Sequence, residues 1–301
     1  MRALTNRSAS VAAPDPRAGL ELARAGLALA RRLGLRSYFA ILLGNAAHNA
    51  FRTGDWSWAL GELEAALAED FEPSDRPQVL WVEARTRAAR GESVGDQLAE
   101  VRRLVGEGED PQQLSFAPDL AACVAFAAGR LDDARTAWLR AAELWAGSWA
   151  GGLATSLLQA TRAALWAGDG AGARDDLAGL DASAVHGPAI EADRRTVRAG
   201  IAALEGRPAD ALAFYREALL AWRDLGLAWD EALCGLDMAT LLDPADPEVR
   251  AAAESTREIL TRLGARPFLS RLEAAMTRSS DRVLVADRPA DPLDTKAAAG
   301  S

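Results

Sequence analysis

The chain has 301 residues, of which 50% are hydrophobic, and a formal net charge of -9. This acidic balance argues against a nucleic-acid-binding protein, which needs clustered positive charge. No uninterrupted apolar run approaches the roughly 20 residues that a membrane-spanning helix requires, and the N-terminus lacks the apolar segment of a signal peptide. The sequence therefore predicts a cytoplasmic protein that binds neither nucleic acid nor membrane directly.

The N-terminal part begins with residues 1–14, which are rich in Ser, Ala and Asn and are predicted to be disordered. Asp15 and Pro16 then form a helix-start pattern, an N-cap acceptor followed by proline at the first helical position. The helix they begin ends near Gly34, so residues 15–34 are interpreted as half a repeat without a first helix. Either residues 1–14 replace that helix or the chain is a piece of a longer protein. The unpartnered apolar face favours the second interpretation.

Six predicted helix pairs follow, each with a turn between its first and second helix. Asp246 and Pro247 repeat the helix-start pattern before the last second helix. A short helix over 266–277 is predicted to cap the C-terminal end, and residues 278–301 are predicted to be a disordered tail. The predicted pairs cover about 37–70, 75–106, 111–146, 150–181, 189–225 and 227–263.

The clearest repeated phrase is Gly129–Ala142, which reads GRLDDARTAWLRAA. After the glycine, apolar, small and aromatic residues recur three or four positions apart, and this spacing places them on one helix face. Similar phrases follow four other glycines, so the spacings in chain order are 37, 38, 39 and 38 residues. The sequence therefore predicts an all-α fold, a right-handed α-solenoid of about six helix-turn-helix repeats with a period of about 38 residues. The other four glycines are Gly54, Gly91, Gly168 and Gly206.

The order of glycine, aromatic and alanine residues resembles the tetratricopeptide signature, lengthened from the usual period of about 34 residues. Together with the phrase LGARPFLSRL at 263–272, these repeats are similar to the C-terminal region of large bacterial signalling ATPases. Those ATPases are fused to class III adenylate or guanylate cyclase domains or to MalT/LuxR-type DNA-binding domains. A phosphate loop is absent, since Lys296 is the only lysine. The resemblance implies the regulatory or sensor arm of such a protein without its catalytic parts.

Few residues suggest chemistry. The glycine-rich stretch at Gly168 follows a predicted helix rather than a strand, and this context favours an inter-helix turn over a nucleotide-binding loop. The two histidines, His48 and His186, lack metal-ligand spacing. The two cysteines, Cys123 and Cys234, are interpreted as small buried side chains. The sequence therefore predicts no catalytic residue, no metal and no cofactor.

The first helices of such repeats are expected to line a concave surface. The central positions of their inner faces lie six residues before each repeat glycine. A second set of inner-face positions lies one helical turn earlier. Two arginines among apolar side chains suit an acidic or amphipathic peptide, although a solvated face that binds nothing is the alternative. The predicted groove is formed by Gly44, His48, Trp81, Arg85, Asp119, Cys123, Leu158, Arg162 and Thr196, with Gly200 at the last central position.

Three functions remain open from the sequence. The leading hypothesis is a non-enzymatic module that binds a protein or peptide and regulates a signalling ATPase, a cyclase or a transcription activator. An enzyme hidden in the groove is the second, but the first helices offer no converging Glu, Asp and His. The third is a small-molecule sensor in which Trp81, Leu158 and Trp166 line an apolar pocket.

Overall fold

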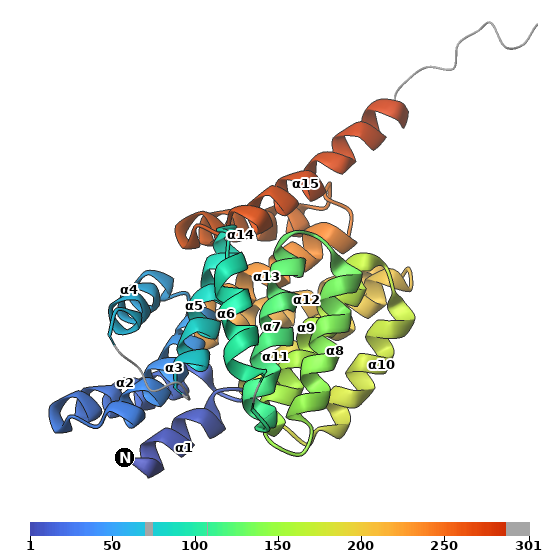
Figure 1. The fold of residues 1–301 in the computed structure, drawn as a ribbon. Helices are drawn as coiled ribbons and strands as arrows, with labels where there is room; N and C mark the ends of the chain where they lie inside the picture. Colours follow the sequence, from blue (N-terminus) through green and yellow to red (C-terminus); the bar gives the residue numbers. More distant parts are fainter. Residues whose placement is uncertain (70–74, 107, 287–301) are drawn as a thin grey trace, which may run out of the picture.

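The computed structural model describes residues 1–69, 75–106 and 108–286, with side chains as far as residue 277. Within these ranges the protein consists of fifteen α-helices, without any strand (Figure 1). No helix in the described part is both long and apolar enough to cross a membrane. The helices are α1 Arg2–Val11, α2 Pro16–Leu33, α3 Arg36–Thr53, α4 Trp56–Leu67, α5 Arg76–Arg90, α6 Gly95–Val105, α7 Pro111–Ala127, α8 Leu131–Trp145, α9 Ala150–Ala167, α10 Gly170–Ala182, α11 Pro188–Leu204, α12 Pro208–Leu225, α13 Ala228–Leu241, α14 Pro247–Leu263 and α15 Arg266–Ala286.

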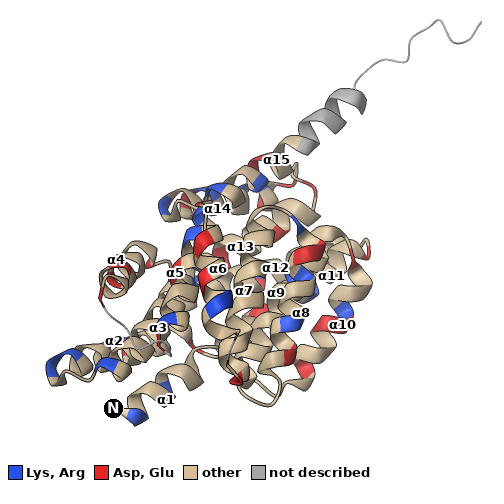
Figure 2. Ribbon diagram, viewed as in Figure 1, with Lys and Arg blue, Asp and Glu red and all other residues tan. Residues whose placement is uncertain are grey.

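Each helix packs against the next one along the chain, from α1 to α15. Odd-numbered helices also contact one another; for example, α3 packs against α5, and α11 packs against α13. This sequential packing of helix pairs confirms the predicted all-α class and a solenoid-like arrangement. Acidic and basic residues are interspersed along the helices (Figure 2).

The five repeat glycines have the same backbone conformation. Their φ angles lie between 73° and 87°, in the left-handed region that a side chain with a Cβ rarely adopts. Each one follows a first helix and turns the chain into the second helix, which explains the sequence period. The predicted helix starts are also present: Asp15 Oδ1 accepts a hydrogen bond from Ala18 N at 3.0 Å, and Asp246 Oδ1 accepts one from Glu248 N at 2.7 Å.

The prediction that residues 1–14 are disordered is wrong for α1. This helix packs against α2 and α3, with Thr5 and Ser8 buried. Asn45 Nδ2 donates to Ser8 Oγ at 3.0 Å and to Thr5 O at 3.4 Å. Because these anchors are polar, the segment shows no apolar periodicity in its sequence. Helix α2 therefore has a helical partner before it, contrary to the half-repeat interpretation.

The predicted boundary between the cap helix and the tail is also wrong. Helix α15 continues through Ala286, so its backbone is helical well beyond the predicted end at residue 277. Residues 287–301, the remainder of the predicted tail, lie outside the described part of the chain.

The two ends of the helix array meet. Helix α13 packs against α3 and α9, and α15 packs against α5. The ring of Phe268 in α15 lies 4.9 Å from that of Trp229 and 5.7 Å from that of Phe126. Arg90 Nε donates to Leu263 O at 3.1 Å, and Arg266 Nε donates to Arg90 O at 3.1 Å. Neighbouring helix pairs are therefore not alone in sharing a core, because helices far apart in sequence also pack together and close the concave side.

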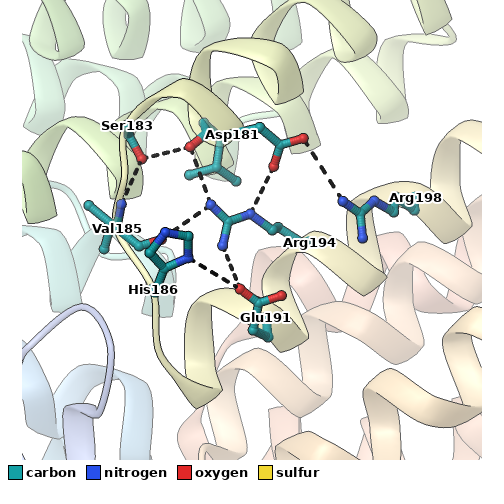
Figure 3. Close-up of polar contacts among 8 residues, drawn as sticks. Asp181, Ser183, Val185, His186, Glu191, Arg194 and Arg198 are labelled. Atoms are coloured by element: carbon teal, nitrogen blue, oxygen red, sulfur yellow. Dashed lines mark hydrogen bonds and ion pairs between the residues drawn. The ribbon is translucent and has the colours of Figure 1, made fainter.

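Arg194 fixes a second closing contact, at the loop between α10 and α11 (Figure 3). This buried side chain donates from Nε to Asp181 Oδ1 at 2.8 Å and from Nη1 to Glu191 Oε1 at 2.7 Å. Its Nη2 contacts two carbonyl oxygens of the α10–α11 segment. Several fixed donors allow one guanidinium to hold a loop without regular structure. The loop in turn docks near the α1–α2 connection, where Ala189 N donates to Pro14 O at 3.1 Å.

Close packing of α13 on α14 depends on Gly235. A Cβ at this position would lie 2.0 Å from Thr256 Oγ1 and 3.2 Å from Ala252 O. We therefore expect Gly235→Ala to lower the free energy of unfolding by about 1–3 kcal/mol in urea unfolding. Gly61→Ala in α4 is the matched control, because a Cβ there meets nothing within 4 Å; it should raise stability by about 0.5–1 kcal/mol. Equal stabilities for the two variants would contradict the close approach.

Candidate functional site

A cavity of about 390 Å³ lies between α1, α3, α5, α7 and the loop that joins α8 to α9. Its volume is within the range of small-molecule binding pockets. Among the residues that the structure describes, no Asp, Glu, Lys or Arg lines it. We call it the amide–aromatic cavity, because most of its lining side chains are of these two kinds. The aromatic residues are His48, Trp81, Phe116, Trp145 and Trp149, and the amides are Asn6, Asn45, Asn49, Gln78 and Gln112.

Trp81 is central to the aromatic wall. It stacks on Phe116 with ring centroids 4.7 Å apart and on His48 at 5.5 Å. Trp149 meets His48 edge-on at 6.5 Å. The indole of Trp81 is held in place by its Nε1, which donates to Asp119 Oδ2 at 2.7 Å. These contacts make a preorganised apolar wall that can bind a flat ring at small cost in side-chain entropy.

The amide wall depends on Gly44. A Cβ at this position would lie 2.6 Å from Gln78 Nε2, so the glycine leaves room for the Gln78 side chain to cross α3. Gln78 Nε2 then donates to Asn45 Oδ1 at 3.3 Å. Gln112 is exposed at the rim of the cavity. Amide groups provide both donors and acceptors, so this wall suits the polar edge of an uncharged or singly charged ligand.

His48 is uncharged in the folded protein. Burial, with the charges of Arg85 and then Arg52, lowers the pKa of His48 to about 3. Arg85 Nη1 lies 3.4 Å from His48 Nδ1, and a guanidinium has donors only, so Nδ1 is assigned as the acceptor. The neutral ring then carries its proton on Nε2. His48 therefore adds one N–H donor to the aromatic side of the cavity.

Replacement of His48 should change how stability depends on pH. The unfolded chain binds a proton near the usual histidine pKa of 6.5, whereas the folded chain binds it only near 3. The contribution of His48 to stability is therefore present above pH 6.5 and lost as pH falls toward 3. We expect the difference in unfolding free energy between the wild type and His48→Gln to fall by up to about 1.4 kcal/mol per pH unit in this window. Burial raises the pKa of Asp193 to about 6, and this group makes the folded state more stable as pH falls. Its effect cancels in the difference between the two proteins, because the wild type and His48→Gln both contain Asp193. Urea unfolding at pH 7, 5.5 and 4 measures this difference, and a constant value would contradict the assignment.

Arg85, Asp119 and Cys123, which the sequence placed in the groove, do not line this cavity. They form a layer next to it, where Asp119 accepts from Trp81 and Cys123 Sγ lies 3.9 Å from Asp119 Oδ2. Burial and the nearby Asp119 charge raise the pKa of Cys123. Cys123 therefore stays a thiol at neutral pH and is a poor nucleophile.

The remaining predicted groove residues lie elsewhere in the interior. Arg162 is only 3% exposed, and its Nε contacts Asp237 Oδ2 at 3.2 Å. Thr196 is buried and accepts a hydrogen bond from Trp222 Nε1 at 3.2 Å. Leu158 is buried in the same core. Along α9 and α11 the predicted open groove is filled by the protein's own side chains, because α13 packs against both helices.

An ion-pair network that the sequence did not reveal lies beside Arg162. Arg52 in α3 contacts Asp230 through Nε at 2.8 Å and Asp193 through Nη2 at 3.3 Å. The carboxylates belong to α13 and α11, so one arginine joins three helices. Arg52 lowers the pKa of Asp193, but burial outweighs this effect. The network ties the N-terminal helices to the C-terminal ones and has a structural role.

Sequence reasoning found His48 and Trp81 but missed most of the cavity. Gln78 and Phe116 each lie 13 residues before a repeat glycine, Gly91 and Gly129. Extending the groove register by one more helical turn would have reached both. Trp145 and Trp149 flank a loop and Asn6 lies in α1, so the repeat register carried no signal for them.

The chain matches no protein-family model, and a search of curated proteins found no match either. Among the described residues, no group of three or more His, Cys, Asp or Glu side chains is arranged to hold a metal ion. The function must therefore be argued from the cavity and its surroundings.

Proposed function

We propose that this chain is a non-enzymatic, tetratricopeptide-like binding module whose amide–aromatic cavity takes a small ligand with a flat apolar body and a polar edge. The observation that carries the proposal is the cavity of about 390 Å³, walled by stacked rings and amides. The repeat type is supported by the five left-handed glycines and the period of about 38 residues. In this proposal the module is the sensor arm of a bacterial signalling protein.

The chemistry of the walls favours such a ligand. A flat ring can stack against Trp149, which is partly exposed, while Gln78 and Gln112 offer donors and acceptors to its edge. Since none of the described residues that line the cavity is charged, a ligand need not strip water from a buried charge of the lining in order to enter.

A peptide that occupies the whole concave face is less well supported. Arg162 is buried in an ion pair with Asp237, and Thr196 is also buried. A peptide would have to displace α13 to reach them. We therefore place recognition in the cavity rather than along the first helices.

Binding of the neutral dye N-phenyl-1-naphthylamine tests the proposal. We expect saturable binding with increased dye fluorescence, and about tenfold weaker binding by Trp149→Ala, which is about 1.4 kcal/mol. Trp58→Ala is the matched control: this tryptophan lies in α4 beneath Arg24, whose Cζ is 4.0 Å from the ring centroid, and should leave the affinity unchanged. Absence of saturable binding, or an equal loss in both variants, contradicts the proposal.

A further inference from the structure

Arg85 is a buried cation without an ion-pair partner among the described residues. It is 6% exposed. Its guanidinium contacts His48 Nδ1 at 3.4 Å and lies over the Phe51 ring at 4.4 Å. The interior arginines Arg52 and Arg162 both contact carboxylates. Because an unpaired buried charge is costly, the absence of an ion pair to Arg85 within the described residues favours a counter-charge from outside the chain.

The positive charge acts on the amide–aromatic cavity through His48. This histidine lines the cavity and contacts Arg85. Burial is the main cause of the lowered pKa of His48, and the charges of Arg85 and then Arg52 lower it further, so two positive charges lie near the ring. The nearby carboxylate Asp119 is engaged by Trp81 Nε1 and does not line the cavity. A negative group placed beside His48 would therefore be attracted by Arg85 and accept the His48 Nε2 proton in a hydrogen bond.

We infer that the ligand is a flat aromatic molecule with a single negative charge, such as an aryl carboxylate, and that Arg85 sets this preference through His48. The rings pack against Trp149, which is partly exposed, and the anionic group lies against His48. Arg85 is a positioning residue in this scheme, because it supplies charge and fixes the His48 tautomer without lining the cavity. The inference rests on the proposed function and goes further by naming the chemical class of the ligand.

Two dyes with the same ring system test the charge preference. N-Phenyl-1-naphthylamine is neutral, and 8-anilino-1-naphthalenesulfonate differs from it by one sulfonate group. We expect the wild-type protein to bind the anionic dye at least tenfold more tightly at pH 7. In Arg85→Met the ratio of the two affinities should fall to about one, whereas Arg85→Lys should keep a clear preference for the anion. Displacement of the dye by 2-naphthoate but not by 2-naphthamide would extend the preference to carboxylates.

The outcomes separate this inference from the proposed function. If the wild type binds both dyes equally and Trp149→Ala weakens both, the cavity binds ligands but the charge preference is wrong. If neither dye binds, both proposals fail. A folded Arg85→Met variant that keeps the wild-type ratio would remove Arg85 from the scheme. Should that variant fail to fold, as judged by circular dichroism, the ratio in the wild type and in Arg85→Lys still decides the matter.

Discussion

Replacement of Arg162 by leucine is expected to lower the free energy of unfolding by about 3–5 kcal/mol. The variant would leave Asp237 in the interior without the guanidinium that contacts its Oδ2 at 3.2 Å. Burial already raises the pKa of Asp237, and Arg162 is the main group that opposes this shift. Without Arg162 the pKa should rise further, so the folded state should gain a proton that the unfolded state releases near pH 4. The loss should therefore be larger at pH 8 than at pH 5, and urea unfolding at the two pH values measures it.

Two further variants test whether burial causes this loss. Arg216 forms an ion pair with Glu248 across α12 and α14, at 2.9 Å between Nη2 and Oε1, but both side chains are exposed. Arg216→Leu should cause no measurable change, because exposed pairs are solvated in either state. The double variant Arg162→Leu with Asp237→Asn should be more stable than Arg162→Leu alone, since no charge is left unpaired and the asparagine can still accept from Trp166. Equal losses for the Arg162 and Arg216 variants would contradict a cost from burial.

Local signals explain why the helices could be located from the sequence. Asp15 with Pro16 and the turn glycines act within a few residues of where they stand. The helix predicted from Pro16 to near Gly34 corresponds to α2, and the pair predicted over about 189–225 corresponds to α11 and α12. Such patterns fix the ends of helices and the face that packs inward. They hold no information on the angle between one pair and the next.

Closure of the array depends on contacts that no local pattern contains. Arg52 lies 178 residues from Asp230 and 141 from Asp193. The repeat register predicted Arg162 on the inner side of α9 but gave no indication that α13 packs against α9, where Arg162 contacts Asp237. Small rotations between successive pairs accumulate along a solenoid, and their sum decides whether a concave face stays open or closes.

The candidate site was predictable only as far as the repeat register extends. His48 and Trp81 occupy register positions on first helices, and both line the cavity. The wall formed by α1 was not predictable, because its buried anchors, Thr5 and Ser8, are polar and resemble a disordered segment in composition. A site that combines a repeat face with a polar helix from outside the repeats appears only in three dimensions.

Replacement of Phe268 by alanine should show how much the closure contributes to stability. The ring is buried, and its centroid lies 4.9 Å from that of Trp229, 5.7 Å from that of Phe126 and 6.4 Å from that of Trp166. Removing so large a side chain from a close-packed core should lower the free energy of unfolding by about 3–5 kcal/mol. Phe268 joins α15 to α7, α9 and α13, so its removal should weaken the attachment of α15 to these helices. Denaturant unfolding measures the loss in free energy.

Hydrogen exchange distinguishes a local opening of the closure from a general loss of stability. In Phe268→Ala the amides of α15 and of α5, which α15 contacts, should exchange faster than those of α11 and α12, which pack mainly against each other. Leu220→Ala is the control, because Leu220 is 55% exposed and its loss should leave both stability and exchange unchanged. If Phe268→Ala unfolds at the same denaturant concentration as the control, the aromatic contacts of Phe268 do not hold the two ends together, and the closure would depend on the polar contacts of Arg52 and Arg90 instead.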